Sequence, residues 1–330
     1  MAEPYPAFTP VNLLTGFLGS GKTTLLRRLL TDPAMANTAV LINEFGEIGL
    51  DHHLIERIDE TMVLLQSGCL CCTVRGELAE ALRDLHARRE RGEVPAFDRV
   101  VIESTGLADP FPVLSTLKSD AVLRHHFRAS NTITTVDAVN AASQSNDYGE
   151  FSRQVSVADR IVLTKTDLAS PSQADSALAA IRRLNPDAPL QVSTDDGLDL
   201  RALLDEGHEV AEASMFRCDE PLAPEGPPHT GQIRSFMLEA ETSTNWTAFG
   251  IWLTMLLNRH GNRILRVKGI LDIEGEDRPV AIHGVQYLVH PPVHMQSWPA
   301  GARRTAIVFI VDGIDPLLIA RSFHAFNALG

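Results

Sequence analysis

The sequence predicts an α/β protein: a doubly wound, mostly parallel sheet followed by a smaller α+β domain. Three observations carry this prediction. Apolar runs of strand length alternate with helical segments up to about residue 210, which is typical of a sheet covered by helices on both faces. The Pro- and Gly-rich stretch DEPLAPEGPPHTG at 219–231 ends that alternation. A glycine-rich turn, GFLGSGKTT at 16–24, joins the first predicted strand to the first predicted helix.

Seven strands and several helices are predicted in the first part of the chain. Many of the strand runs are continuously apolar, as expected for strands buried on both faces of a parallel sheet. The predicted strands are 11–17, 39–45, 62–67, 99–104, 132–138, 160–166 and 189–194. The clearest helical segments are 22–30, 76–90 and 172–184. This alternation predicts a first domain at 1–218.

The remainder of the chain predicts a linker at 219–231 and a second domain at 232–330. Alternation between apolar and polar residues predicts strands, and a period of 3.6 predicts helices. The predicted strands are 233–241, 264–273, 280–290 and 303–312, and the predicted helices are 245–261, which ends at a glycine cap, and 315–326. A domain of this size and mixture belongs to the α+β class.

The composition is that of an ordinary globular protein, and the net charge limits which classes of partner the protein can bind. Lys and Arg number 29 and Asp and Glu 42, so the net charge is -13. An acidic chain is repelled by phosphate backbones, which argues against nucleic-acid and anionic-membrane partners. The first ten residues lack the basic and apolar regions of a signal peptide, and no apolar run is long enough to span a membrane. We therefore expect a cytoplasmic protein.

The segment GFLGSGKTT fits the phosphate-loop pattern G-x-x-x-x-G-K-[ST] in its required place between a strand and a helix. Glycines allow the tight turn whose N–H groups surround phosphate oxygens, and the helix N-terminus adds a positive dipole. The lysine can reach the β- and γ-phosphates, and the threonine after it can bind Mg²⁺. The nucleotide-binding residues predicted here are Gly16, Gly19, Ser20, Gly21, Lys22, Thr23 and Thr24.

Two further strand ends carry polar residues expected near a bound nucleotide. RVVIESTG at 99–106 places Glu103 at a strand tip, where a carboxylate can hold Mg²⁺ together with Thr23. We therefore predict catalytic roles for Lys22 and Glu103. TKTD at 164–167 resembles the guanine-reading N-K-x-D element of GTPases, with Thr164 in place of Asn. Thr164, Lys165 and Asp167 are accordingly predicted to bind the base of GTP.

Three of the four cysteines lie within four positions, in SGCLCC at 67–72. They follow the third predicted strand, at the sheet edge where ligands bind. Thiolates are strong ligands for Zn²⁺, Co²⁺ or Cu⁺, and three protein ligands leave one position of a tetrahedral metal open. A redox pair and simple packing of small apolar side chains remain alternatives at this point. A disulfide framework is not indicated.

Taken together, these motifs resemble the CobW-type metallochaperone GTPases, a family that includes relatives of UreG and HypB. The resemblance rests on the phosphate loop, SGCLCC, and a further set of segments along nearly the whole chain. Those segments are NEFGEIGLD at 43–51, ESTGLADP at 103–110, VDAVN at 136–140, TKTD at 164–167, RVKG at 266–269, HGVQ at 283–286 and Trp298.

The resemblance implies a GTPase that binds a transition metal, Zn²⁺ or Co²⁺, at Cys69, Cys71 and Cys72 and delivers it to a client protein. The client would be a metalloenzyme or a cofactor-synthesis protein. GTP and Mg²⁺ would be the cofactors, and a homodimer across the nucleotide follows by analogy with related proteins. The resemblance also suggests Glu44 as a ligand of the metal or of Mg²⁺, the alternative being a solvated loop carboxylate.

Two other functions compete with this interpretation. The first is a metal sensor or scaffold that holds nucleotide for structure and delivers nothing. The second is a small-molecule kinase with the same phosphate loop, which the guanine-reading element argues against. The linker also lacks the His-rich tract of many relatives, since it contains only His229, so storage of metal is not expected.

Overall fold

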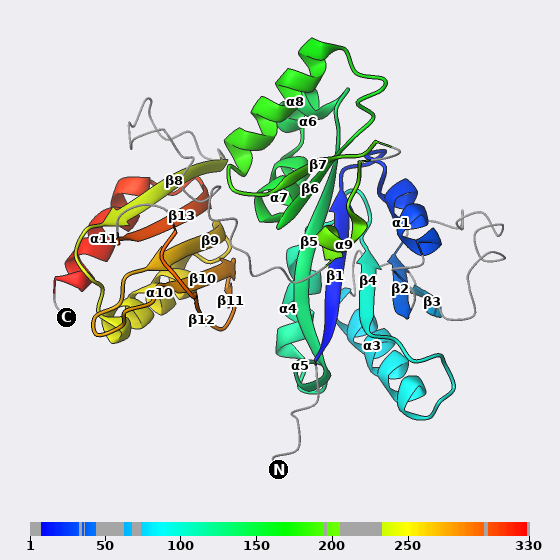
Figure 1. The fold of residues 1–330 in the computed structure, drawn as a ribbon, viewed down its shortest axis with the longest axis horizontal. Helices are drawn as coiled ribbons and strands as arrows, with labels where there is room; N and C mark the ends of the chain where they lie inside the picture. Colours follow the sequence, from blue (N-terminus) through cyan, green and yellow to red (C-terminus); the bar gives the residue numbers. More distant parts are fainter. Residues whose placement is uncertain are drawn as a thin grey trace. The chain divides into compact units, whose positions relative to one another are not determined.

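The computed structural model describes residues 8–32, 35, 37–43, 63–67, 74–194, 197–204, 233–299 and 303–328 (Figure 1). By its internal contacts the chain divides into two compact units. The first unit contains Met1–Leu178 and Pro189–Gly207, and the second contains Ala179–Ala188 and His208–Gly330. The predicted linker at 219–231 lies outside the described residues, so the domain boundaries proposed from the sequence stay a prediction.

The first unit is built on a parallel sheet with strand order β3-β2-β4-β1-β5-β6-β7. Each pairing between neighbouring described strands is parallel. The strands are β1 (Thr9–Gly16), β2 (Thr38–Asn43), β3 (Val63–Ser67), β4 (Arg99–Glu103), β5 (Phe127–Asp137), β6 (Arg160–Thr164) and β7 (Leu190–Val192). These seven strands confirm the predicted α/β class and its strand positions. Because the chain reverses its direction of travel around β1, a ligand site is expected at the carboxyl end of this strand.

Helices cover this sheet on both faces. They are α1 (Lys22–Thr31), α3 (Val74–Glu90), α4 (Phe111–Ser119), α5 (Leu123–His126), α6 (Ala141–Asp147), α7 (Gly149–Val157), α8 (Pro171–Leu184) and α9 (Leu200–Leu204). On one face, leucines of α1 and α9 form a core with strand residues such as Leu14 and Val101. Strand residues of the opposite parity, including Leu13 and Ile102, are equally buried, as a doubly covered sheet requires.

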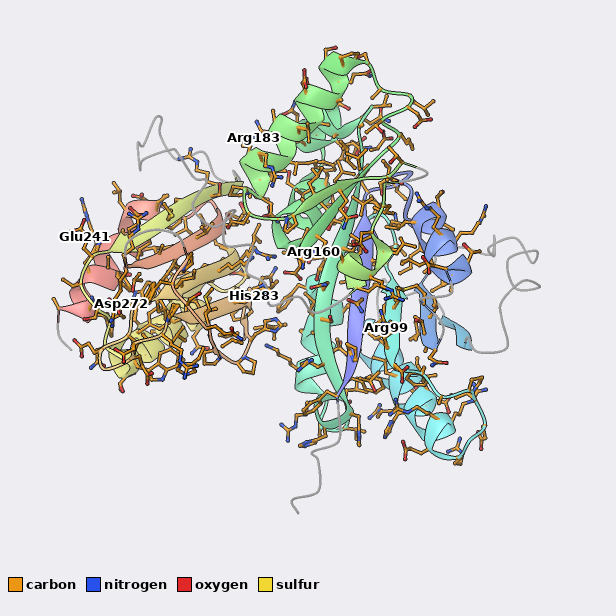
Figure 2. All side chains as sticks on the ribbon, viewed as in Figure 1. Arg99, Arg160, Arg183, Glu241, Asp272 and His283 are labelled. Atoms are coloured by element: carbon orange, nitrogen blue, oxygen red, sulfur yellow. The ribbon has the colours of Figure 1, made fainter. Side chains whose placement is uncertain are left out.

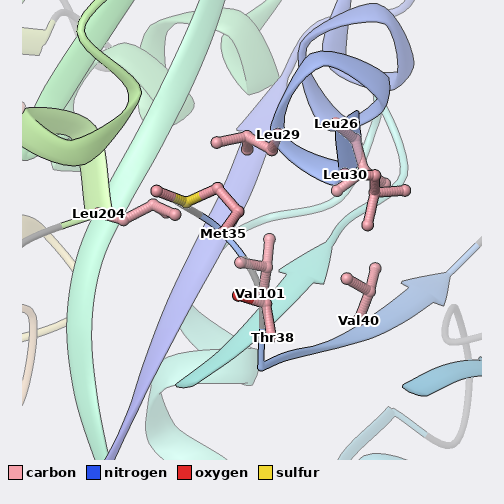
Figure 3. Close-up of a pocket in the computed structure, with 8 residues that line it drawn as sticks. All are labelled: Leu26, Leu29, Leu30, Met35, Thr38, Val40, Val101 and Leu204. Carbon is pink, nitrogen blue, oxygen red and sulfur yellow. The ribbon is translucent and has the colours of Figure 1, made fainter. Parts of the chain in front are cut away.

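A small apolar cavity lies where α1 packs on the sheet (Figure 3). Its lining residues come from α1, β2, β4 and α9 and from Met35, which lies between α1 and β2. They are Leu26, Leu29, Leu30, Met35, Thr38, Val40, Val101 and Leu204. No charged side chain lines it, so it belongs to the packing that holds α1 on the sheet. The polar groups expected around a nucleotide lie elsewhere, at the N-terminal end of the same helix.

The second unit contains an antiparallel sheet in the order β11-β10-β9-β13-β8, with β12 paired to β10. Helices α10 and α11 pack against each other, and their apolar residues share one core with the sheet. The elements are β8 (Ile233–Ala240), α10 (Trp246–His260), β9 (Ile264–Leu271), β10 (Val280–Val285), β11 (Leu288–Val289), β12 (Val293–His294), β13 (Thr305–Asp312) and α11 (Pro316–Asn327). This sheet confirms the predicted α+β class.

The structure corrects two local predictions in the second unit. The strand predicted at 280–290 is a hairpin, because Gln286 has φ 51° and turns the chain between β10 and β11. Gly261 does follow α10, but its conformation is right-handed, so it is not a left-handed glycine cap. An added Cβ on Gly261 would lie 2.5 Å from the Tyr287 ring. Close approach, not backbone conformation, favours glycine there.

A polar corner around Asp272, which is labelled in Figure 2, holds the end of β9 beside the start of β13 in the second unit. Arg303 donates from Nε to Oδ1 of buried Asp272 at 2.9 Å, and the N–H of Asp272 donates to Thr305 Oγ1 at 3.0 Å. The guanidinium of Arg303 also lies 5.7 Å from the ring of Trp298, the tryptophan singled out in the sequence. Further hydrogen bonds tie Arg303 to the Glu276 carbonyl and Trp298 to the Asp277 carbonyl within the same unit, so the corner is structural.

Among the described residues, no helix is both long enough and apolar enough to cross a membrane.

Candidate nucleotide-binding site

The loop between β1 and α1 has the backbone that its glycines predict. Gly16, Gly19 and Gly21 have φ values of 142°, 70° and 95°, which L-residues with a Cβ rarely adopt. Gly16 is also crowded, because an added Cβ would lie 2.5 Å from the carbonyl oxygen of Thr135. Gly21 is the N-cap of α1. The loop therefore leads directly into a helix N-terminus, where main-chain N–H groups can bind anions.

Lys22 is the first residue of α1 and its ammonium group turns back over the loop. Nζ donates to the carbonyl oxygens of Gly16 and Phe17 at 2.9 and 3.1 Å. The side chain is 8% exposed. Burial lowers the pKa of Lys22, and the nearby carboxylate of Glu103 opposes that shift. The amine is thus held beside the loop on which phosphates would lie.

Thr23 near the start of α1 meets Glu103 at the end of β4. The Thr23 hydroxyl donates to Glu103 Oε1 at 3.0 Å. Glu103 ends β4, which lies beside β1 with Leu14 opposite Glu103. A hydroxyl and a carboxylate are the hard oxygen ligands that Mg²⁺ prefers. The two side chains therefore fit a magnesium ion bound together with nucleotide phosphates.

The other predicted loop residues differ in their surroundings. Ser20 is buried, and its hydroxyl bonds to Thr135 Oγ1 at 2.6 Å. Gly19 and Thr24 are exposed. Ser104, after Glu103, donates to Thr15 Oγ1 at 2.9 Å.

Sequence reasoning missed the supporting residues Thr15, Ser104 and Thr135 of this hydroxyl network. Each is a buried hydroxyl residue within the last four positions of a predicted strand, and that position was the available signal.

Thr164 stands where the usual guanine-reading element has Asn, and its side-chain hydroxyl forms hydrogen bonds with main-chain carbonyls. Its hydroxyl donates to the carbonyl oxygens of Ser20 and Val136 at 2.7 and 3.1 Å. Its methyl group is 3.3 Å from the position of a Cβ added to Gly21. Thr164 therefore connects the phosphate loop to β5 and β6. Direct binding of a nucleotide by this residue stays a prediction.

Lys165 is anchored by the buried carboxylate of Asp137, which lies in the VDAVN segment. Lys165 has φ 57°, and its Nζ donates to Asp137 Oδ2 at 2.8 Å. Asn140 and the N–H of Val139 also donate to Asp137. Burial alone would raise the pKa of Asp137, but these hydrogen bonds outweigh it and the pKa is lowered. Asp137 therefore stays ionised at neutral pH and holds Lys165. Asp167 is exposed on the same loop.

The loop after β4 lies against the phosphate loop. A Cβ added to Gly106 would lie 2.7 Å from the main-chain nitrogen of Leu18, so only glycine allows this approach. Leu18 is 55% exposed and Leu107 52% exposed. The first unit thus brings the loops after β1, β4, β5 and β6 to one edge of the sheet, as the carboxyl ends of parallel strands require.

The predicted metal ligands lie outside the described residues. These are Cys69, Cys71, Cys72 and Glu44. Within the described part of the chain, no group of three or more His, Cys, Asp and Glu side chains could hold a metal ion.

Two family models match the chain. The model described as "CobW/HypB/UreG, nucleotide-binding domain" matches residues 10–191, and that described as "Cobalamin synthesis protein cobW C-terminal domain" matches residues 233–327.

Several named proteins are similar over most of their length. "Zinc chaperone YjiA" of Escherichia coli (strain K12) is 37% identical over 278 residues, which are 84% of this chain and 86% of that protein. "Zinc chaperone CobW" of Sinorhizobium sp is 26% identical over 335 residues, 92% of each chain. The crystal structure of zinc(II)-bound YjiA GTPase from E. coli matches with a TM-score of 0.72 at 31% identity, covering 97% of this chain and 99% of that one.

Proposed function

Because this chain belongs to the CobW/HypB/UreG family, we propose that it is a GTP-hydrolysing zinc chaperone. The observation that carries the proposal is the built phosphate site, in which buried Lys22 lies over the loop and Thr23 meets Glu103 at 3.0 Å. The choice of zinc as the metal rests on the relatives that are named zinc chaperones. The proposal includes a cytoplasmic location and a homodimer, neither of which the geometry requires.

In the proposed reaction, water attacks the γ-phosphorus, the bond to the bridging oxygen breaks, and GDP and phosphate leave. The loop 16–21 and the N-terminus of α1 would bind the β-phosphate through main-chain N–H groups. Lys22 would release its two loop carbonyls and pair with phosphate oxygens. Thr23 and Glu103 would hold Mg²⁺, which neutralises charge on the phosphates. These roles keep Lys22 and Glu103 as the catalytic residues.

Guanine selectivity is proposed to come from the loop after β6. Asp167 would accept hydrogen bonds from the N–H groups of the base, and Lys165 would pack on the ring. The support is the carboxylate of Asp137, which fixes the Lys165 ammonium at 2.8 Å. Thr164 contributes indirectly, because it bonds the carbonyl of Ser20 in the phosphate loop.

Zinc is the cargo of the proposed chaperone, and its ligands would be the thiolates of Cys69, Cys71 and Cys72, with Glu44 as a further candidate. Three thiolates leave a fourth position for a ligand from the client metalloenzyme or cofactor-synthesis protein, so the metal can be exchanged. The same ligands accept Co²⁺. If GTP and metal favour the same conformation, each raises the affinity for the other by the same factor.

The test is an anaerobic titration of Zn²⁺, and separately Co²⁺, into the reduced protein with Mg²⁺ and either GDP or a non-hydrolysable GTP analogue. Cobalt–thiolate absorption reports ligation by cysteine. We expect the metal affinity to differ at least about fivefold between the two nucleotides, a typical coupling. The double variant Cys71→Ser with Cys72→Ser should lose binding, and the matched control Cys218→Ser should keep it.

Equal metal affinity in both nucleotide states would contradict nucleotide-controlled delivery. The chain would then be a metal sensor or scaffold that holds nucleotide for structure. Retention of metal by the double cysteine variant would instead contradict the proposed ligands. ATP preference with a phosphorylated small-molecule product would contradict the GTPase itself.

A further inference from the structure

Helix α7 touches the loop that follows Glu103 through one buried side chain. Nε2 of Gln154 donates to the carbonyl oxygens of Gly106 and Ala108, each at 3.1 Å. Gln154 is 0% exposed. Both amide hydrogens are thus used on a loop of a different element, 46 and 48 residues away in the sequence. Because both of its amide hydrogens bind loop carbonyls, the buried Gln154 side chain fixes the main chain of this loop.

The two bonds set the orientation of the loop's peptide groups. In a trans peptide the C=O and the following N–H point in opposite directions. Because Gln154 holds the Gly106 carbonyl, the N–H of Leu107 points away from α7. No hydrogen bond of Leu107 N–H is found within the described residues. Main-chain N–H groups of this kind are the donors that bind phosphate oxygens.

The same helix also contacts the phosphate loop. Tyr148, the N-cap of α7, has its ring 4.7 Å from that of Phe17. Leu18, the next residue of the phosphate loop, lies against Gly106. Helix α7 therefore braces two loops that must together surround the terminal phosphate of a nucleotide.

The amide oxygen of Gln154 supports a functional role over simple packing. Oε1 is buried and has no hydrogen-bond partner within the described residues. Leaving a buried acceptor unpaired is unfavourable, and an apolar side chain of the same shape would avoid that cost. The presence of an amide at this position, despite its unpaired oxygen, is explained by the two N–H donors that hold the loop.

We propose that Gln154 is a positioning residue for recognition of the γ-phosphate. It holds the Gly106–Ala108 segment so that the N–H of Leu107 faces the terminal phosphate, and it does not touch the nucleotide. The N–H of Ala108 already donates to the Thr105 carbonyl. The inference deepens the proposed function and rests on GTP being the nucleotide. The GDP-bound protein should depend little on Gln154, since GDP has no phosphate for this loop to recognise.

The test compares Gln154→Met, which keeps the volume and loses both donors, with Gln154→Glu. The matched control is Gln144→Met on α6, where a buried glutamine has no hydrogen bond to the 104–109 loop within the described residues. For each variant, the affinities for GDP and for a non-hydrolysable GTP analogue are measured by titration calorimetry. The kcat of GTP hydrolysis and the thermal midpoint are measured on the same full-length preparations.

We expect Gln154→Met to lower kcat and the affinity for the GTP analogue by about tenfold each, the value of one lost charge-assisted contact, while GDP affinity changes less than about twofold. Gln154→Glu should add a pH dependence, because a protonated acid donates one hydrogen bond and an ionised carboxylate repels both carbonyls. Its kcat relative to Gln154→Met should fall as the pH rises toward about 8 to 9, where buried glutamates ionise.

Equal losses for GDP and the GTP analogue would overturn the positioning role, because the defect would then lie in the whole site. So would a lower thermal midpoint with unchanged kcat and nucleotide affinities, or Gln144→Met reproducing the loss. If the wild-type protein binds the GTP analogue more tightly than GDP but hydrolyses nothing, the proposed GTPase fails while the nucleotide comparison still tests Gln154.

Discussion

The two sheets of this protein bury polar residues for different purposes. In the parallel sheet, buried polar side chains gather at the carboxyl ends of strands, among them Glu103, Asp137 and Thr164. In the antiparallel sheet, the main-chain N–H of Asp272, just after β9, donates to the Thr305 hydroxyl of β13 at one corner. Parallel strands all end at one edge, so their end residues converge. The carboxyl ends of antiparallel strands alternate between the two ends of the sheet, so polar residues at these ends are not gathered into one site. The polar corner of the second unit therefore serves stability.

The hydrophobic cores of the two units also differ in the side chains that form them. The second unit is held by aromatic contacts, with ring centroids of Phe236 and Phe309 5.4 Å apart and those of Trp252 and Phe323 5.1 Å apart. The Trp252 N–H donates to Ser322 Oγ at 2.9 Å. In the first unit, an aliphatic core supports the sheet beneath α1. The comparison predicts that substitutions at the carboxyl ends of the parallel strands affect nucleotide binding and hydrolysis. Substitutions in the antiparallel sheet should affect the stability of the fold.

The largest expected effect is that of Lys22→Ala. This variant removes the ammonium group that lies over the phosphate loop, so kcat for GTP hydrolysis should fall by about 100-fold or more, as when a transition-state donor is lost. The measurement is phosphate release at saturating GTP. Lys118→Ala, which removes an amine from α4, serves as the control. Comparable hydrolysis by Lys22→Ala and wild type would contradict the assignment of this edge as a catalytic site.

A matched pair of glycine substitutions separates the two sheets. Gly16→Ala introduces a Cβ 2.5 Å from the Thr135 carbonyl at φ 142°, and Gly269→Ala introduces one 2.7 Å from the Ala306 carbonyl. Each should cost about 1–3 kcal/mol in strain or overpacking. Gly16→Ala should lower GDP affinity about tenfold or more. Gly269→Ala should lower the free energy of unfolding and leave GDP affinity unchanged.

Titration calorimetry with GDP and urea unfolding of both glycine variants check this pair. The comparison fails if Gly269→Ala weakens GDP binding as much as Gly16→Ala does.

The smallest effect concerns base selectivity. Asp137→Asn keeps the shape and the hydrogen bond from Val139 but removes the charge that holds Lys165, so discrimination of GDP from ADP should fall by about tenfold, or 1.4 kcal/mol. Direct titration with both nucleotides gives the ratio of affinities. Asp175→Asn, at an exposed position on α8, is the control. Unchanged discrimination in Asp137→Asn would mean that Asp137 supports the fold and not the base-reading loop.

The fold and the backbone of the loop before α1 were predictable because their signals are local. Continuous apolar runs predicted the seven strands of the parallel sheet, and the glycine spacing at 16–21 predicted the loop before α1. Helices α4 to α7 were missed, since α4 contains Pro112 and α6 is short and polar, and neither has a long apolar period. The turn at Gln286 was missed because no Gly, Asn or Asp marks it.

The sequence by itself determined the α/β class, the phosphate loop with Lys22 and Thr23, and the strand tip at Glu103, because each depends on neighbours within a few positions. The tertiary structure alone decided which side chains hold those groups. Asp137 meets Lys165 across 28 residues, and Ser20 meets Thr135 across 115. Gln154 reaches Gly106 across 48. No local pattern encodes such pairs, because the order of parallel strands, and not the distance along the chain, brings them together.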